Sequence, residues 1–463
     1  MTTFYFRKCV VIIGLSLLTP VVSLFSQKHY SLSDLVEASR ANLPVLKQKQ
    51  ALVEASRASV TDTRHSFLPQ IKAGEQLNMG SDNSLAGSYF TFGITPSTSA
   101  GVRNSNNLEA AVGNLAVVYA EYELANFGLN DAKLKYAQSL VGLQEADKQK
   151  EQYFADIQVA RLYLYILKNK FRLDADEQNI ERYQKIFDII HALTASGMKA
   201  GADSSLAKAE LSRTRISYNQ TLGLIGQLKQ ELSFYTGIPS DQLLLDTLAN
   251  TSLNSKPVLL DYAMDTLNNP LLNYYARKKA LSLLNDNLIR KSYQPKILLA
   301  GASWARGSSI QYNDQYKSLA TGLGYQRFNY GLGVAFTYNL FNGLFKKDRL
   351  AINRYQIQAS NYELEQQKAA LQSAVLQADN SLATTEANLR EIPVQLHAAQ
   401  DTYAQKLAQY KAGIISLIDL TNASFVLYRS QTDYIETLND WYLAQLNKAA
   451  STGNLQQFIQ TIN

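Results

Sequence analysis

The chain has almost no cysteine. Cys9 is the only one among 463 residues, and it lies in an apolar segment that follows two basic residues near the N-terminus. Pro20 and Ser26 come after this segment, which is short for a transmembrane helix, since such a helix needs about 20 apolar residues. The pattern is typical of a secretory signal. We therefore predict a signal peptide at residues 1–26 and an exported mature chain without thiols, disulfides or cysteine chemistry.

Charged residues are also scarce, at 18% of the chain, where about 25% is usual. Lysines and arginines give a net charge of +6 but are scattered along the chain, so we predict no nucleic-acid partner. The four histidines lie far apart, without the spacing of metal ligands. We find neither a nucleophile motif nor a phosphate-binding loop. The sequence therefore predicts neither an enzyme nor a metal or cofactor site.

Proline is rare, and none occurs between residues 97 and 238. Because proline interrupts helices, its absence permits very long ones. Residues 128–196 are rich in Ala, Leu, Gln, Glu and Lys, which favour helix, and a helix of this length measures about 100 Å. We predict two shorter helices, at about 31–67 and 204–236, which stack end to end and together match the long one.

The second half of the chain repeats the first. The aligned landmarks are Pro44 and Pro270, Pro69 and Pro295, Tyr122 and Tyr338, Gly197 and Gly413, Asp203 and Asp419, and Gly237 and Gly453. The first two pairs have an offset of 226 and the others an offset of 216, which indicates rigid elements separated by a surface loop of variable length. We predict structural repeats at 27–250 and 251–463. The second long helix contains Pro393, so we expect a kink or break near Ile392.

The segments beside the loops change to a period of two. "NYGLGVAFTYNL", residues 329–340, places aromatic and apolar side chains on one face and small or polar ones on the other. A strand of about eleven residues can cross an outer membrane obliquely. A weaker counterpart lies at about 110–122, and two further strands follow Pro69 and Pro295. These strands suit either an ordinary sandwich or a membrane sheet, and the very long flanking helices favour the membrane sheet.

Four strands cannot close a membrane sheet. An open sheet edge cannot face lipid, so the chain must oligomerise. Three copies give twelve strands, which is a closed number wide enough to hold water. The intervals 78–107 and 306–326, rich in Gly, Ser and Asn, are the expected outer loops.

Together these features resemble the TolC-type outer membrane efflux protein family. The resemblance rests on the duplicated halves, the proline after the first helical segment, "YNLFNG" after a strand, and the two Gly-x5-Asp turns. It covers essentially the whole mature chain. It implies a mainly α protein with a membrane β part, namely a tandem-duplicated protomer of a homotrimeric channel-tunnel. In such a tunnel, a 12-stranded β-barrel in outer membrane lipid continues into a 12-helix periplasmic α-barrel.

The resemblance also implies the function. The protein would be the exit duct of a tripartite efflux or type I secretion system, a passive conduit that a periplasmic adaptor protein and an inner-membrane pump open at its periplasmic tips. A rival hypothesis is a structural or adhesive trimeric coiled-coil protein anchored in the outer membrane without a conducting pore. That rival needs neither a tandem duplication nor two returning hairpins. The substrate stays open among drugs, metal ions, peptides and proteins.

Each repeat would supply one hairpin tip, where the family docks its adaptor. By resemblance, the docking residues are Gly197, Met198, Lys199, Gly413 and Ile414. The alternative is that these are merely turn residues. Exposed apolar side chains at a tip suit a coiled-coil partner better than water.

The resemblance places the pore constriction at Asp419 and Asn422, where the family carries acidic side chains. Three copies of Asp419 would form a carboxylate ring that repels anions and attracts cations. The alternative is local, because Ser416 and Asp419 have the spacing of a capping box and Asp203 would be a natural N-cap.

The family's closed-state latch corresponds to Asp203, Tyr410 and Ile415, with Ile415 in place of an arginine. We therefore expect a hydrogen bond between Asp203 and Tyr410 without the charged arm. The resting tunnel would then be less tightly shut, or held shut by apolar contact at Ile414 and Ile415.

Overall fold

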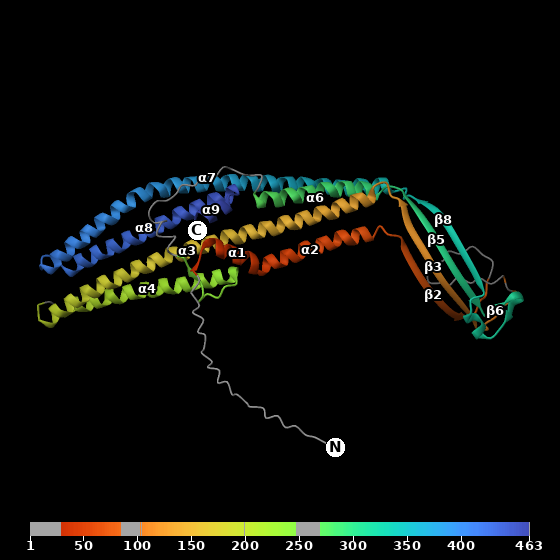
Figure 1. Ribbon diagram of the computed structural model, residues 1–463, viewed down its shortest axis with the longest axis horizontal. Coiled ribbons are helices and arrows are strands. Elements are labelled where there is room, and N and C mark those ends of the chain that lie inside the picture. The colour runs from red at the N-terminus through yellow and green to blue at the C-terminus, as the bar shows by residue number, and fades with distance from the viewer. Residues whose placement is uncertain (1–28, 85–101, 103, 199, 247–268, 463) are drawn as a thin grey trace, which may run out of the picture.

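The computed structural model describes residues 29–84, 102, 104–198, 200–246 and 269–462. The predicted signal peptide and Lys199 lie outside the described residues, as do the start of the second repeat and part of the loop 78–107. Figure 1 shows an elongated molecule with a β-sheet at one end and two helical hairpins that run to the other end.

Eight α-helices of the described residues make up most of the molecule. In the first half they are α1 (Leu32–Asn42), α2 (Pro44–His65), α3 (Leu129–Ala195) and α4 (Gly201–Thr236). In the second half they are α6 (Pro270–Ser292), α7 (Asn342–Lys411), α8 (Leu417–Thr452) and α9 (Leu455–Thr461). No helix of the described ranges combines the length and the hydropathy that a membrane-crossing helix needs.

Short helices stack end to end beside the long ones, as predicted. Figure 1 shows α4 followed by α2 along one side of α3, and α8 followed by α6 along the other side. The junctions have a local cause. Gly237 and Gly453 end α4 and α8 in the left-handed conformation, which glycine adopts without strain. Pro44 and Pro270 begin α2 and α6, where a missing N–H costs nothing.

The prediction of one helix over residues 31–67 was wrong. Leu43 separates α1 from α2 with an extended backbone, φ −61° and ψ 120°. The ring of Pro44 clashes with a helical conformation of the residue before it, so the helix must stop there and restart at Pro44.

We expected a kink or break near Ile392, and the break is absent. α7 continues through Pro393 as one helix of 70 residues, although Figure 1 shows it bending along the half that leads to the tip. Proline removes one helical hydrogen bond, while the neighbouring Ile392 is buried. Burial of Ile392 and, about two turns further on, of Ala399 therefore helps to keep the helix continuous.

One antiparallel sheet combines strands of both halves. Its strands are β2 (Gln70–Gly80), β3 (Ala111–Ala125), β5 (Lys296–Ser308) and β8 (Arg327–Thr337), in the order β2-β3-β5-β8. The central pair β3–β5 joins the two halves, with Gly113 opposite Ser308. The outer edges are β2 and β8. On β8 the predicted aromatic face is fully open, since Tyr330 is 88% exposed and Leu332 is 78% exposed.

Short elements complete the described chain. They are β1 (His29–Tyr30) paired with β4 (Leu244–Leu245), β6 (Ile310–Gln311) paired with β7 (Gln315–Tyr316), and the 3-10 helices η1 (Tyr312–Asp314) and η2 (Leu319–Leu323). The β6–β7 pair and both 3-10 helices lie in the loop between β5 and β8.

The main hydrophobic core lies at the middle of the molecule, where α1 and α9 pack on α3 and α8. Its largest side chains, Trp441, Tyr163 and Phe458, are each 1% exposed. The Arg40 guanidinium on α1 donates to both carboxylate oxygens of Asp156 on α3, with the shortest contact 2.7 Å. The core therefore fixes which face of α3 turns toward α1.

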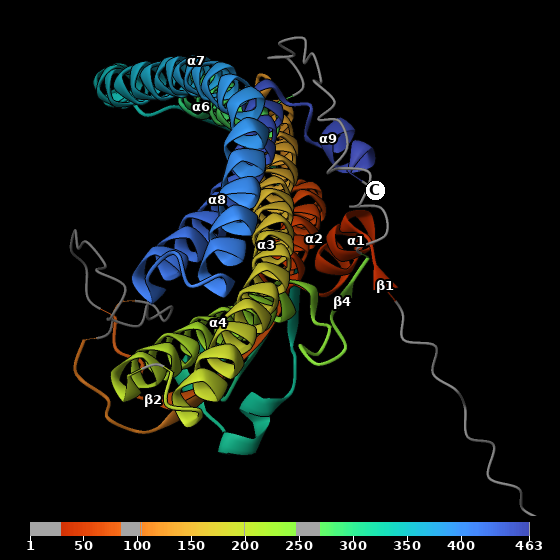
Figure 2. The ribbon, with the colours of Figure 1, turned by 90° about the vertical axis from the view of Figure 1, so that its left-hand side faces the viewer.

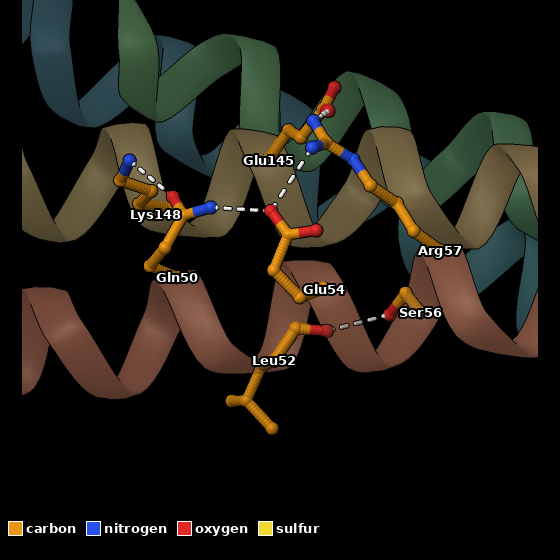
Figure 3. Close-up of polar contacts among 7 residues, drawn as sticks. All are labelled: Gln50, Leu52, Glu54, Ser56, Arg57, Glu145 and Lys148. Carbon is orange, nitrogen blue, oxygen red and sulfur yellow. Dashed lines mark hydrogen bonds and ion pairs between the residues drawn. The ribbon is translucent and has the colours of Figure 1, made fainter.

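Further toward the sheet, polar side chains join α2 to α3 (Figure 3), beside an apolar cluster of Leu43, Leu46 and Ala155. Arg57 on α2 donates to Glu54 at 3.0 Å and to Glu145 on α3 at 2.8 Å. Lys148 on α3 donates to Gln50 at 2.7 Å. Glu145 and Glu54 raise the pKa of the Arg57 guanidinium. The Arg57 contacts are exposed to water, so they align the two helices more than they stabilise the fold.

Candidate functional site

The two hairpin turns are built alike. Gly197 and Gly413 have φ angles of +75° and +74°. The N–H of Met198 donates to the Leu193 carbonyl at 2.9 Å, and the N–H of Ile414 donates to the Gln409 carbonyl at 2.9 Å. This 6→1 bond, together with a 5→2 bond from each glycine, is the Schellman motif that ends a helix in a left-handed residue.

Gly413→Ala is expected to weaken the tip by about 1 kcal/mol, because a Cβ is unfavourable at positive φ. Hydrogen exchange of the amides that flank the turn would measure the loss. Gly223→Ala is the matched control. Gly223 lies within α4 and has open space around it, so alanine there should stabilise the helix by about 0.5–1 kcal/mol. Equal exchange at the turn in wild type and Gly413→Ala would contradict the assignment.

Apolar side chains stand exposed at both tips. Met198 is 67% exposed and Ile414 is 72% exposed, whereas Ile415 is half-buried. Among the predicted docking residues that the structure describes, Gly197, Met198, Gly413 and Ile414 all lie at the surface. The two tips thus present the same chemistry at the same place in each hairpin.

A second apolar cluster, which we call the tip cluster, holds the hairpins side by side. It joins the ends of α3 and α4 to those of α7 and α8. Its buried members are Tyr183, Ile186, Ile190, Ala207, Leu211, Tyr410, Leu417 and Leu420, and Ile415 packs against them. The Tyr183 hydroxyl also donates to the Thr421 carbonyl at 3.4 Å.

The structure brings the predicted latch residues into one neighbourhood. Tyr410 is buried in the tip cluster, and burial raises its pKa, with the negative charge of Asp203 adding to the effect. Ile415 packs against the same cluster. The expectation that Asp203 would be the N-cap of α4 was wrong. Ala200 is the N-cap of α4, and Asp203 lies in the first turn, because Gly201 and Ala202 already adopt helical geometry.

The expected capping box at the start of α8 is present. The Asp419 N–H donates to Ser416 Oγ at 3.3 Å, and the Ser416 N–H donates to Asp419 Oδ2 at 3.1 Å. The Ser416 hydroxyl also donates to Oδ2, and these bonds lower the pKa of the Asp419 carboxyl. Asp419 is therefore ionised at neutral pH. Asn422, nearly one turn further along, is exposed like Asp419.

A polar centre above the tip was not predicted. Asp176 on α3 is 1% exposed. It accepts bonds from the hydroxyls of Ser217 at 3.2 Å, Thr221 at 2.7 Å and Tyr428 at 2.5 Å. Ser217 and Thr221 belong to α4, and Tyr428 belongs to α8. One buried carboxylate therefore ties both hairpins together. The sequence signal for it was weak, since Ser217 and Thr221 are merely four residues apart on one helix face.

Within the described part of the chain, no group of three His, Cys, Asp or Glu residues could hold a metal ion. Neither tip nor the Asp176 centre is such a group.

Comparison with known proteins gives the class. Residues 35–237 and 285–454 match the family "Outer membrane efflux protein". Outer membrane protein TolC of Escherichia coli K12 is 20% identical, over 96% of this chain and 86% of TolC. The fold matches the Campylobacter jejuni CmeC outer membrane channel with a TM-score of 0.72, 13% identity, and 92% of this chain and 86% of CmeC covered.

The fold also matches the open state of the Neisseria gonorrhoeae MtrE outer membrane channel. That match has a TM-score of 0.70 and 15% identity, and it covers 92% of this chain and 89% of MtrE. The chain belongs to the outer membrane efflux protein family. The predicted family, the mainly helical architecture, the outer membrane location and the role in efflux are confirmed. The family consists of channel proteins, trimers that work with adaptors and inner-membrane pumps.

Proposed function

We propose that three copies of this chain form a passive conduit without catalytic activity, which an adaptor protein and an inner-membrane pump open at the hairpin tips. One observation supports this above all others. Two hairpins of equal construction end in the same glycine turn with an exposed apolar residue, Met198 or Ile414. They lie at the end of the molecule opposite the sheet (Figure 1). The halves 27–250 and 251–463 would each contribute one such hairpin.

In the proposed assembly, the open edges β2 and β8 of neighbouring copies pair. Backbone groups at a sheet edge cannot stay unsatisfied in lipid, and the exposed aromatic face of β8 suits contact with acyl chains. The outer membrane lipid is then the partner of the sheet, and the pump and adaptor are the partners of the tips.

Asp419 and Asn422 form the proposed constriction. The capping bonds all fall on one oxygen of Asp419, Oδ2, so the capping role and a place in a carboxylate ring are compatible. The lowered pKa of Asp419 keeps such a ring negative at neutral pH. We propose Asp203, Tyr410 and Ile415 as the latch beside it.

Conductance in a planar bilayer tests the conduit. Purified protein is expected to give discrete channel openings, and an anchored coiled coil would give none.

Cysteines introduced as Met198→Cys and Ile414→Cys test docking, because they should cross-link to an adaptor helix when both proteins are present. The exposed site Glu181→Cys, further up α3, is the control and should not cross-link.

Asp203→Ala is expected to raise the conductance of the closed state, because the proposed latch loses the carboxylate whose charge acts on Tyr410. Removal of a bond to a charged group corresponds to about 1.5–3 kcal/mol per site, which is ample to shift a gating equilibrium. Single-channel recording would measure it. Asp188→Ala, on the exposed face of α3, is the control. An unchanged closed state in Asp203→Ala would remove Asp203 from the latch.

A further inference from the structure

The helix junctions leave a trough across the middle of α3. α4 stops at Thr236 and α2 starts at Pro44 on one side, while α8 stops at Thr452 on the other. No helix of the described residues fills the step between the stacked ends. The resulting cavity has a volume of about 770 Å³ and lies against α3 and α7, which continue past both junctions. Its size falls within the range of about 300–1,000 Å³ that small-molecule sites have.

The trough lies on the face of α3 that points away from α1 and α9. Asp156 and Tyr163, seven residues apart, share the face toward the core. Phe154 and Arg161, also seven apart, line the trough. The two pairs are offset by two residues, which is about 200° around a helix. Figure 2 looks from the tips and shows both hairpins leaning away from α1 and α9, so α1 and α9 lie outside the conduit and the trough lies inside.

The lining combines exposed aromatic rings with the positive charge of Arg161. Phe154 is 45% exposed and Phe234 is 67% exposed, although both lie at the middle of the molecule. Arg161 forms no ion pair or hydrogen bond with any residue of the described chain. The carboxylate of the trough, Glu151, is already 3.7 Å from Lys150. The trough therefore offers aromatic surface and one uncompensated positive charge.

We propose that this trough binds aromatic organic anions of drug size as they pass through the conduit. A flat ring system contacts Phe154 and Phe234, where it is removed from water. Its carboxylate or sulfonate accepts two parallel bonds from the Arg161 guanidinium, which is shaped for such groups. The placement inside the conduit rests on the proposed function, whereas the pocket and its charge are properties of the single chain.

The anionic dye 8-anilinonaphthalene-1-sulfonate tests the proposal, and its uncharged relative N-phenyl-1-naphthylamine is the companion probe. Fluorescence titration of the full chain in amphipol should show one saturable site per chain for the anion. Arg161→Gln should weaken binding of the anion about tenfold, which is the effect of one charge-assisted contact. It should weaken binding of the uncharged probe less than twofold. Phe154→Ala should weaken binding of both probes about tenfold, because it removes apolar contact area.

Arg213→Gln is the matched control, since Arg213 is an exposed arginine on α4 outside the trough. It should bind both probes as wild type does. Absence of a saturable site would overturn the proposal, and so would equal affinity for the anion in wild type and Arg161→Gln. In a planar bilayer, the anion should also reduce the conductance of the wild-type channel. Binding without that reduction would refute the position inside the conduit. A wild type that never conducts would refute the proposed function. The fluorescence titration would then test only whether the trough binds the anion.

Discussion

Asp176→Ala is expected to loosen the tip half of both hairpins and to lower its local stability by about 3 kcal/mol. The substitution leaves the hydroxyl of buried Thr221, and those of half-buried Ser217 and Tyr428, without their shared acceptor. Each orphaned buried group costs about 1–3 kcal/mol. Because Tyr428 belongs to the second hairpin, the loss should extend beyond the helix that carries the change.

Hydrogen exchange of the amides around Thr221 and Tyr428 would measure this effect, together with the closed-state conductance. Asp174→Ala is a close control, because Asp174 lies two residues away on α3 and is exposed. Asp176→Asn keeps the shape and most of the accepting capacity, so it should show a smaller loss. If Asp176→Ala and Asp174→Ala exchange alike, the buried carboxylate does not hold the hairpins together.

Arg40→Ala is expected to destabilise the central core by about 3 kcal/mol at neutral pH, since it leaves a buried carboxylate without its counter-charge. Asp156 is 3% exposed, and Arg40 is its ion-pair partner at 2.7 Å. The double variant Arg40→Ala/Asp156→Asn should recover much of the loss, because the buried charge is gone. Arg57→Ala is the control. Its ion pairs are exposed to water (Figure 3), and its removal should be close to neutral.

The loss in Arg40→Ala should shrink as the pH falls. Burial raises the pKa of the Asp156 carboxyl even with Arg40 beside it, and removal of Arg40 raises it further. The folded chain then holds this proton more tightly than the unfolded chain. Stability is therefore highest below the ordinary pKa of an aspartate and declines as the pH rises through the raised one. Chemical unfolding at several pH values measures this trend. A deficit independent of pH would show that Arg40 acts through packing alone.

The sequence predicted features with a local physical cause. Gly197 and Gly413 stand at equal places in both repeats because only glycine tolerates the left-handed turn without strain, so the repeat itself revealed them. Gly237 marked the end of α4 for the same reason. Such residues act through their own backbone, and a single chain suffices to recognise them.

Features that depend on packing were missed. The sequence around Asp176 and Asp174 does not distinguish the two residues. The hydroxyls that bond Asp176 lie 41 to 252 residues away along the chain. Pro393 did not break α7, because tertiary contacts override helix propensity. Pro44 was misjudged in the opposite sense, since a proline suits the start of a helix as well as it interrupts one. The trough at Arg161 follows from where α4 and α8 end and α2 begins, which no local pattern encodes.

The pairing of β3 with β5 sets an order of events during biogenesis. Gly113 finds its partner at Ser308, which emerges from the ribosome and crosses the inner membrane long after it. Until then β3 can pair only with β2, and an isolated two-stranded hairpin is marginally stable in water. Contacts so distant along the chain close slowly. The strand edges therefore stay open until β5 arrives, so chains truncated before β5 should be prone to aggregate.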